Sequence, residues 1–424
     1  MKLIVAEPGH FHATLLQKEM YPGLDPRVSV YAPLGPEALE YLARISRFNA
    51  RAENPAHWEL DVHLSAHPMD ELVRDRAGDI VVFAGRNRGK IDRILRALEA
   101  GFHVLADKPW VIESADLPKL ERALQVADER GLAAYDIMTE RYEVTSELHR
   151  EFVNDSEVFG ELERGGASHP AISLFSAHNI MKTVAGVPLR RPPWFFDTKV
   201  QGEGLSDVGT HLVDLAQWTA FPDQAVDAAK DIEILSGRRW PLALTAAQFE
   251  AVTREPRADG LDYYCNNSVR YTLRGIHVSV EAIWDWEAPK GAGDVYTAVF
   301  RGSRAVAEIR QGAAENHRPE LYIVPAAAHR AEVFAAARRR VAQLQSRWPG
   351  LGAVETGSEL RLEIPDRFRV GHEAHFAQVA NRFFEYVREP RSMPAWERPG
   401  MIAKYLVSTQ GVDAGARAAG ADAR

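Results

Sequence analysis

The sequence contains a single cysteine, Cys265, and no apolar run that approaches the ~20 residues needed to cross a bilayer. One thiol excludes an internal disulfide and is typical of a reducing compartment. The N-terminus begins directly with the strand-like segment 3–6, without the basic and then long apolar stretches of a secretory signal. We therefore expect a cytoplasmic protein without a membrane partner.

The chain also lacks an excess of positive charge. It carries 51 Lys and Arg against 59 Asp and Glu, which gives a formal net charge of −8. A net negative chain has no general attraction for nucleic acids or anionic membranes. With 424 residues, 46% hydrophobic and 26% charged, it is long enough for two or three domains with large cores. The expected partner is thus a small molecule.

The first 140 residues alternate short apolar strands with amphipathic helices. Such alternation predicts a parallel sheet covered by helices on both faces, which is a doubly wound α/β fold. The expected strands are 2–6, 27–32, 60–64, 79–84, 102–106 and 133–138, and the expected helices are 10–20, 36–47, 68–76, 88–100 and 114–130.

From about residue 157 the pattern changes to successive strands. Ile276, Val278 and Val280 alternate with polar residues, the period-two signature of a half-buried antiparallel strand. We expect an α+β region with a large, mostly antiparallel, open-faced sheet, and the exposed face predicts a homodimer or homotetramer. Its expected strands are 225–235, 243–253, 262–274, 276–286, 294–301 and 303–310, joined in part by hairpin turns at 274–275 and 301–303, and followed by helices 329–347 and 371–388 and a disordered Ala- and Gly-rich tail at 411–424.

Two segments about a hundred residues apart carry chemistry. In His103-Val-Leu-Ala-Asp-Lys-Pro-Trp110, Pro109 restricts Lys108 to extended backbone at the carboxyl end of a strand, where open α/β sheets bind ligands. In the Gly-rich segment 202–214, Asp207 and His211 are four residues apart and share one face of a helix expected at 207–221. Each feature alone has an ordinary alternative, a solvated lysine or a helix cap followed by a histidine. Together they can deprotonate an alcohol while a cofactor removes the hydride.

On these segments the chain resembles the glucose–fructose oxidoreductase / inositol dehydrogenase (Gfo/Idh/MocA) family. Asp107 replaces the glutamate of the family's Glu-Lys-Pro element, and residues 207–214 match its Asp-x-Gly-x-His-x-x-Asp element. The likeness covers all but the last dozen residues, and segments 182–186 and 191–197 point to a branch with its own C-terminal domain. It implies a Rossmann domain over 1–142 that binds NAD or NADP, and a substrate-binding and oligomerisation domain over 143–410.

The usual dinucleotide signature is eroded. A Rossmann turn has the pattern G-x-G-x-x-G, but residues 7–12 read Glu-Pro-Gly-His-Phe-His, and only the middle glycine remains. The second strand ends without the acid or arginine that would distinguish NAD from NADP. Arg86, Arg88 and Lys90 either hold phosphate or an acidic substrate, or are surface charges at a helix start. The cofactor-binding candidates are Gly9, His10, Phe11, His12, Tyr31, Asn87, Asp107 and Pro109.

Aromatic and hydrogen-bonding side chains around the Gly-rich segment are typical of sugar pockets, because the C–H faces of sugars pack on rings. The substrate-binding candidates are Arg141, His178, Lys182 and Trp194; for Trp194 a core or interface role is an equal alternative. His10-x-His12 and His63-x-x-x-His67 have metal-like spacings, but no cysteine cluster or second carboxylate motif joins them. We therefore predict no metal site.

These observations predict an NAD(P)-dependent oxidoreductase that acts on a sugar or polyol hydroxyl, with Lys108, Asp207 and His211 as its catalytic set. Two alternatives remain. One is a redox-neutral sugar lyase or epimerase that recycles tightly bound NAD. The other is a non-enzymatic sugar- or nucleotide-binding sensor, which the loss of two of the three signature glycines would favour.

Overall fold

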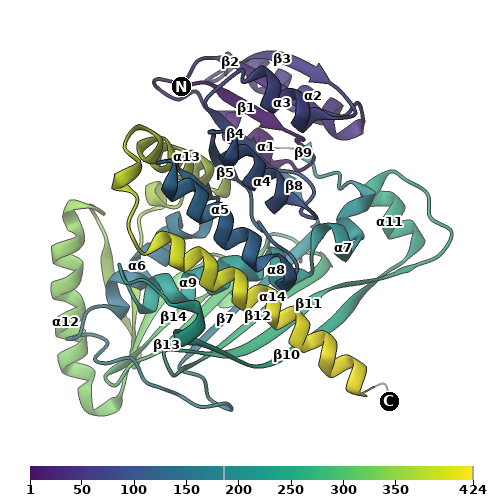
Figure 1. Cartoon of the computed structure of the whole chain (residues 1–424). Coiled ribbons are helices and arrows are strands. Elements are labelled where there is room, and N and C mark those ends of the chain that lie inside the picture. Colours follow the sequence, from purple (N-terminus) through teal and green to yellow (C-terminus); the bar gives the residue numbers. More distant parts are fainter. Residues whose placement is uncertain (185–186, 423–424) are drawn as a thin grey trace. The chain divides into compact units, whose positions relative to one another are not determined.

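The computed structural model describes residues 1–184 and 187–422, and the chain forms two compact units (Figure 1). Unit 1 contains Met1–Thr139 together with Arg191–Gly202 and His372–Arg398, and unit 2 contains Glu140–Arg190, Glu203–Gly371 and Pro399–Arg424. Two segments that are distant in sequence therefore join the first unit. Residues 185–186 of the branch-specific segment and 423–424 of the expected tail lie outside the described residues. No helix in the described ranges is both long and apolar enough to be a membrane span.

Unit 1 is built on a parallel sheet with the strand order β3-β2-β1-β4-β5-β6. Every residue of β1 and β4 is buried, as expected for strands covered on both faces. The order reverses between β1 and β4, which is the switch point of a doubly wound fold. The predicted fold class is thus confirmed. The strands are β1 Leu3–Ala6, β2 Arg27–Ala32, β3 Glu59–Leu64, β4 Ile80–Phe83, β5 His103–Ala106 and β6 Ala134–Asp136.

Helices of unit 1 start where the sequence supplies proline in the first turn, as in α2, α3 and α5. The predicted helix 10–20 is shorter: α1 covers His12–Leu15, a 3-10 turn covers Leu16–Lys18, and Glu19 is extended. The remaining helices are α2 Pro36–Ala50, α3 Pro68–Asp75, α4 Lys90–Glu99, α5 Leu117–Glu129, α7 Thr198–Gln201 and α13 His372–Arg388, with 3-10 turns at Ser114–Asp116, Pro193–Phe196 and Pro390–Ser392.

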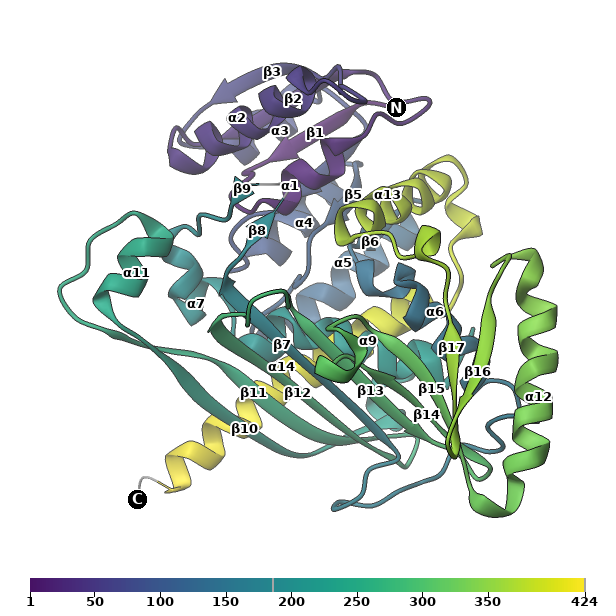
Figure 2. The same cartoon turned by 180° about the vertical axis from the view of Figure 1, so that it is seen from behind.

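Unit 2 contains a sheet with the order β10-β11-β12-β7-β13-β14-β15-β17-β16, in which only β12 and β7 pair in parallel among the described residues (Figure 2). The hairpin at Arg274–Gly275 has positive φ at both residues, as a type I′ turn requires. The mostly antiparallel sheet is confirmed. Its strands are β7 Ile172–Met181, β10 Ile232–Leu244, β11 Leu261–Leu273, β12 Ile276–Glu287, β13 Val295–Arg301, β14 Ala305–Arg310, β15 Glu320–Pro325, β16 Gly352–Thr356 and β17 Glu359–Glu363, with a separate ribbon of β8 Thr183–Val184 and β9 Val187–Pro188.

Along the central strands, buried and partly exposed residues alternate, so one face of this sheet is covered and the other is open. Helices α8 and α9 contact the covered face at β7, β11 and β12. The helices are α6 Val144–Val153, α8 Gly204–Asp207, α9 Gly209–Ala220, α10 Ala228–Asp231, α11 Ala246–Thr253, α12 Arg330–Gln343 and α14 Glu397–Asp422, with 3-10 turns at Thr139–Tyr142, Ala313–Glu315, Ala327–His329, Leu344–Ser346 and Asp366–Phe368.

Two predicted strands of unit 2 need correction. Segment 243–253 was expected as a strand, but only residues 243–244 are strand, at the end of β10, and α11 follows because Thr245 and Gln248 make a reciprocal capping box that starts a helix. The strand expected at 225–235 begins only at Ile232, because Asp227 caps the short helix α10. The central strand β7 was not predicted at all.

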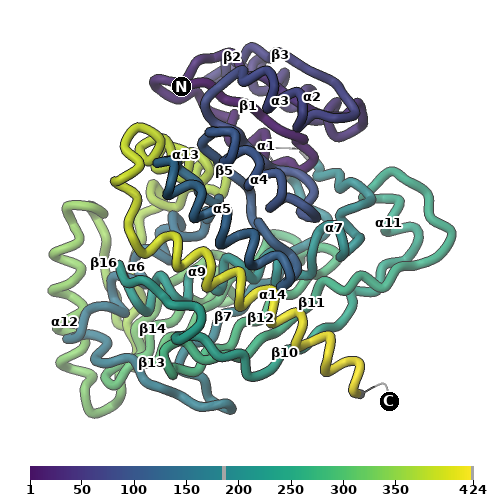
Figure 3. The backbone as a smooth tube through the Cα atoms, viewed as in Figure 1, coloured from purple at the N-terminus to yellow at the C-terminus, as the bar shows by residue number. Residues whose placement is uncertain are grey.

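The predicted disorder of residues 411–424 is wrong for the part that is described. Helix α14 continues to Asp422, drawn as the yellow tube in Figure 3. A Cβ added to Gly237 of β10 would lie 2.4 Å from the Gly411 carbonyl oxygen and 2.6 Å from the Gly415 nitrogen. The small residues therefore let helix and strand backbones touch, so their abundance marks a packing face.

Candidate functional site

Lys108 lies two residues past the end of β5, at the carboxyl end of the parallel sheet, as the sequence predicted. Asp107 donates its backbone N–H to the carbonyl of Phe83, the last residue of β4, at 2.7 Å, which continues the pairing one residue past the end of β5. The Lys108–Pro109 peptide bond is cis, and Lys108 is 8% exposed. The lysine is thus presented from the rigid edge of a sheet, where ligands of this fold class bind.

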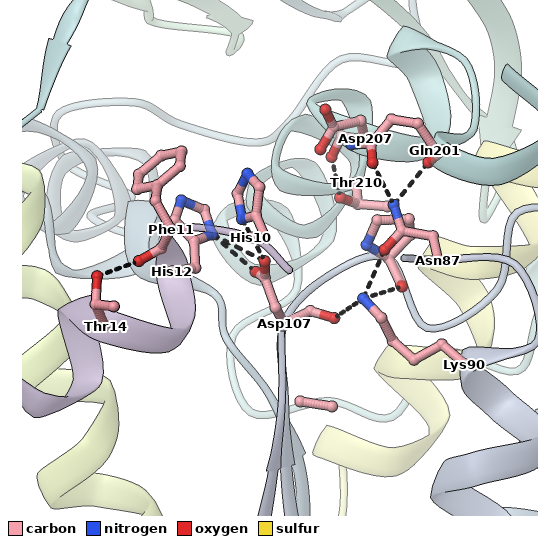
Figure 4. A network of polar contacts seen from close by, with 12 residues as sticks. His10, Phe11, His12, Thr14, Asn87, Lys90, Asp107, Gln201, Asp207 and Thr210 are labelled. Carbon is pink, nitrogen blue, oxygen red and sulfur yellow. Dashed lines mark hydrogen bonds and ion pairs between the residues drawn. The ribbon is translucent and has the colours of Figure 1, made fainter. Parts of the chain in front are cut away.

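A second lysine holds this segment from within. The ammonium of Lys90, in the first turn of α4, donates to Asn87 Oδ1 at 2.6 Å and to the carbonyls of Asp107 at 2.9 Å and Pro109 at 3.1 Å (Figure 4). Lys90 is 1% exposed. It therefore fixes the backbone on both sides of Lys108, and the interpretation of Lys90 as a surface cation or a phosphate ligand is wrong.

The Asp107 carboxylate lies between two histidines of the turn after β1. His10 Nδ1 is 3.1 Å from its Oδ2, and His12 Nδ1 is 3.0 and 2.9 Å from its two oxygens (Figure 4). Burial opposes ionisation of Asp107, but the His12 and His10 rings outweigh it and hold the pKa of Asp107 well below its usual range. Burial lowers the pKa of His12 well below its usual range despite Asp107.

The turn after β1 is closely packed against the turn after β4. A Cβ at Gly85 would lie 2.3 Å from the Glu7 carbonyl oxygen, so only glycine allows this approach. A Cβ added at Gly9 would lie 3.4 Å from the Trp194 ring and 3.7 Å from Glu37 Cγ. Glu37 also accepts hydrogen bonds at 2.9 Å from the Trp194 indole and from Arg86. The remaining glycine thus faces an aromatic ring and a carboxylate.

Glu37 is a residue that the sequence analysis missed. It lies in the first turn of α2, a few residues beyond the end of β2, whereas the acid that binds the ribose was expected at the strand end itself. Trp194, expected to contact substrate, belongs to unit 1 and lies against Gly9. In the sequence, Glu37 could have been recognised as a ribose-binding candidate because it is the first acidic residue after β2.

The segment 191–202 is tied to the turn after β4 by Asn87. The Asn87 side-chain amide donates to the Gln201 carbonyl at 2.6 Å, and the backbone N–H groups of Asn87 and Arg88 both donate to the Val200 carbonyl. Asn87 also accepts from Lys90. Its side chain therefore links α4 to the 191–202 segment.

Two further cofactor-binding candidates of unit 1, Tyr31 and Phe11, pack against histidine rings. The Tyr31 ring is buried, stacks on His63 with centroids 4.5 Å apart, and directs its hydroxyl to Asp75. Phe11 is the N-cap of α1 and its ring is 4.4 Å from that of His10. One face of the Tyr31 ring is thus occupied by a histidine.

In unit 2, Asp207 ends α8 and His211 lies in the first turn of α9. The predicted helix 207–221 is interrupted at Val208, where His211 donates to the Val208 carbonyl in a tighter turn. Gly204 begins α8 so close to β11 that a Cβ there would lie 1.9 Å from the Cys265 carbonyl oxygen. Both side chains are therefore set on a short helical pair pressed onto the sheet.

A buried charge cluster fixes α9 one turn further on. Asp214 accepts a bidentate pair of bonds from Arg141 at 2.5 and 2.6 Å and a third from Lys404 at 3.0 Å. Burial opposes ionisation, yet Arg141 and Lys404 hold the pKa of Asp214 far below its usual range. Arg141, a substrate candidate, thus uses two of its N–H groups to anchor the helix that carries Asp207 and His211.

The other two substrate candidates of unit 2 converge on an acid that was not predicted. Lys182 Nζ lies 2.6 Å and His178 Nδ1 3.3 Å from Asp294 Oδ2, and the Asn179 backbone donates to the other carboxylate oxygen. The His178 ring also packs 5.2 Å from that of Trp284. The end of β7 therefore presents a polar cluster beside an aromatic ring.

A nicotinamide dinucleotide fits the switch point of unit 1. The strand order is that of dinucleotide-binding sheets, and at this edge Gly9 lies beside the Trp194 ring and the Glu37 side chain, the kinds of group that contact a base and a ribose diol. Two features depart from the usual site: α1 is only one turn long, and Glu7 and Glu37 bring negative charge. Arg86 lies 2.9 Å from Glu37 and Arg93 lies 3.7 Å from Glu7, which compensates this charge.

Comparisons with known proteins agree with this architecture. Residues 148–416 match the family described as "Putative oxidoreductase C terminal domain", and no curated protein matches the chain. The chain is similar to a crystallised "putative oxidoreductase" from Parabacteroides merdae, with 39% identity, 98% of each chain covered and a TM-score of 0.95.

Two more distant structures share the fold. KijD10, a 3-ketoreductase from Actinomadura kijaniata crystallised with NADP and TDP-benzene, is 17% identical over 96% of this chain and 95% of its own, with a TM-score of 0.57. A levoglucosan dehydrogenase crystallised with NADH and levoglucosan is 14% identical over 98% of this chain and 97% of its own, with a TM-score of 0.61. The resemblance predicted from the two motifs is confirmed, and the chain belongs to the oxidoreductase family that carries this C-terminal domain within the Gfo/Idh/MocA group.

Proposed function

We propose that the protein is an NAD(P)-dependent oxidoreductase that acts on a sugar or polyol hydroxyl. The observation that carries the proposal is the doubly wound sheet with Lys108 held at the carboxyl end of β5. Each unit contributes its own motif, because unit 1 supplies Lys108 and unit 2 supplies Asp207 and His211.

The cofactor would be held by the switch-point residues of unit 1, with the main chain of Gly9–His12 near the phosphates and Asn87, Asp107 and Pro109 at the strand ends. Tyr31 is assigned to the adenosine side. We assign the ribose diol to Glu37, whose carboxylate accepts hydrogen bonds and would repel a 2′-phosphate. This assignment favours NAD over NADP. When bound, the nicotinamide supplies the hydride acceptor.

The side chains of the chain itself handle the proton and the charge. His211 accepts the proton of the substrate hydroxyl as a general base. Lys108 hydrogen-bonds the same oxygen and stabilises the negative charge that develops there. Asp207 binds the substrate and orients the cationic partners. His178, Lys182, Arg141 and Trp194 are assigned to substrate recognition, with His178 and Lys182 the best placed because Asp294 fixes both at a polar, aromatic site.

A carbohydrate substrate is supported by the nature of the distant structures and by the polar cluster of unit 2. Levoglucosan dehydrogenase was crystallised with levoglucosan, and KijD10 with a nucleotide derivative. Hydroxyl-rich ligands need paired donors and acceptors beside an apolar ring face. His178, Lys182 and Asp294 beside Trp284 provide both.

The first experiment is to identify the nucleotides released from the purified, acid-denatured protein and to titrate the stripped protein with NAD⁺ and NADP⁺. Bound nucleotide, or binding by the stripped form, supports the proposal and names the cofactor for a screen of sugars and polyols. The absence of both would overturn it and favour a sensor.

Catalysis is tested by Lys108→Met and His211→Ala under saturating cofactor. Each variant is expected to lose roughly 100-fold or more in turnover, the typical contribution of a positioned acid–base group. His277→Ala, on β12 and away from the motif, is the control and is expected to keep full activity. Full turnover in both catalytic variants would contradict the proposed roles. Turnover without accumulation of free NADH would favour the redox-neutral alternative.

The open face of the unit 2 sheet also supports a homodimer or homotetramer, because a half-covered antiparallel sheet usually packs against another surface. Sedimentation velocity at micromolar concentration tests this. A monomer alone would contradict it.

A further inference from the structure

We propose that His10, His12 and Asp107 form a binding site for one divalent first-row metal ion of the zinc class. No metal was predicted here, because neither a cysteine cluster nor a second carboxylate motif joins the His-x-His spacing in the sequence. The fold supplies that carboxylate from almost a hundred residues away. The three ligand atoms lie within 4.8 Å of one another, all of them in unit 1.

The donor set suits such an ion. Two imidazole nitrogens and one carboxylate oxygen are the ligands of many catalytic zinc and iron sites. The atoms that face one another are separated by 2.9 to 3.1 Å. Metal bonds of about 2.0–2.1 Å at tetrahedral angles require ligand atoms roughly 3.3 Å apart. The two His–Asp separations therefore need to open by only a few tenths of an ångström to admit an ion, and the three ligand atoms already lie within 4.8 Å of one another.

The ligands are held before any ion arrives. The His12 ring packs 4.7 Å from that of Phe376 and 5.6 Å from that of His372, both in α13. Asp107 is fixed through its main chain, because its N–H is bonded to Phe83 and its carbonyl to Lys90. The His10 side chain is 16% exposed, whereas those of His12 and Asp107 are 9% and 5% exposed. Solvent thus reaches the cluster from the His10 side, which provides a path for the ion.

Three protein ligands leave at least one coordination position for water or an oxygen ligand. Open positions are typical of catalytic rather than structural zinc sites. Asp107 is followed directly by Lys108, so the ion would bind at the strand end that presents the proposed substrate-binding lysine. Metal binding does not depend on the dehydrogenase proposal, and either proposal can fail alone.

The test is isothermal titration of the chelator-stripped full-length protein with ZnCl₂, followed by the visible absorption spectrum after addition of CoCl₂. We expect about one ion per chain. We also expect His10→Ala and His12→Ala each to weaken Zn²⁺ binding by roughly 100-fold or more, beyond the loss usual for residues outside the coordination shell. A d–d absorption band of bound Co²⁺ would report the nitrogen and oxygen ligands.

His67→Ala is the matched control, because His67 is an exposed histidine of the same unit. It is expected to bind Zn²⁺ as the unaltered protein does. Asp107→Asn keeps the size of the side chain and removes the charge, so it tests the carboxylate if the alanine variants fold poorly. Absence of micromolar Zn²⁺ and Co²⁺ binding by the unaltered protein overturns the proposal. So does binding that His10→Ala, His12→Ala and Asp107→Asn all retain.

Discussion

The two units hold their candidate residues in place with buried charges of opposite sign. In unit 1 a buried lysine, Lys90, donates hydrogen bonds to three neutral oxygens. In unit 2 a buried anion, Asp214, is surrounded by two cations. A buried charge held by dipoles can be replaced by an apolar side chain at moderate cost. Removing the central charge of an ionic cluster leaves its partners uncompensated, which costs more. The two units should therefore respond differently to loss of their central charge.

The largest expected effect is that of Asp214→Asn. The variant leaves Arg141 and Lys404 buried with their shared carboxylate removed, and breaking such a buried pair typically costs about 3–5 kcal/mol of unfolding free energy. Urea denaturation followed by circular dichroism measures it. Asp223→Asn is the control, because its pair with Arg150 is exposed and such pairs contribute little. Equal stability of the Asp214 and Asp223 variants would remove the proposed difference between the units.

The same residue predicts a pH dependence. Because the folded-state pKa of Asp214 is lowered, its stabilisation is present above the unfolded-state pKa of about 3.9 and is lost as pH falls further. The stability difference between the unaltered protein and Asp214→Asn should therefore shrink below about pH 4. A constant difference down to pH 3 would contradict this linkage.

The next effect is that of Gly204→Ala in unit 2. The added methyl group would lie 1.9 Å from the Cys265 carbonyl oxygen, so α8 must move away from β11. Overpacking of this kind typically costs about 1–3 kcal/mol. We expect a lower melting temperature and reduced turnover, because α8 carries Asp207. Gly420→Ala, in α14 with nothing within 4 Å of the added carbon, should keep or slightly raise stability. Unchanged melting and turnover of Gly204→Ala would show that this close approach is not needed.

Unit 1 is tested by Lys90→Met. Each of the three lost hydrogen bonds typically contributes about 1.5–3 kcal/mol when the donor is charged, but the variant no longer buries an ammonium group, so we expect a net loss smaller than that of Asp214→Asn. Because Lys90 fixes the carbonyls on both sides of Lys108, kcat should fall by a larger factor than KM rises. The assay is run at a temperature well below the melting temperature of the variant. Lys119→Met, which breaks an exposed pair with Asp92 and Asp116, is the control. A destabilisation larger than that of Asp214→Asn would reverse the comparison.

The sequence predicted the sheets of both units better than the partners of their buried polar side chains. The parallel sheet was readable because its strands are short apolar runs separated by amphipathic helices, and Lys108 was placed correctly because Pro109 follows it. Lys90 and Asp107 were interpreted only from their neighbours in sequence, but their partners are a carbonyl from another segment and two distant histidines. Such partners become apparent only once the fold is known.

In unit 2, the secondary structure of two segments was also predicted wrongly from local sequence. The segment 243–253 was apolar enough for a strand, but the capping pair of Thr245 and Gln248 decided for a helix. In the tail, composition alone suggested disorder, whereas a Cβ at Gly411 would lie 2.5 Å from Leu205 and one at Gly415 would lie 3.0 Å from the Arg238 backbone. A local pattern cannot distinguish a flexible glycine from one that allows a close approach.

The smallest expected effect concerns the carboxylate of unit 1 that the sequence analysis missed. In Glu37→Gln the side chain still accepts one hydrogen bond but loses the charge that would repel a 2′-phosphate, and Arg86 loses its ionic partner. The ratio of the Kd values for NADP⁺ and NAD⁺ should therefore fall by about tenfold, equivalent to ~1.4 kcal/mol. Glu40→Gln, on the same helix and paired with Arg44, is the matched control and should leave the ratio unchanged. If the unaltered protein prefers NADP⁺, or if both variants behave alike, Glu37 does not bind the ribose and the coenzyme preference must come from another residue.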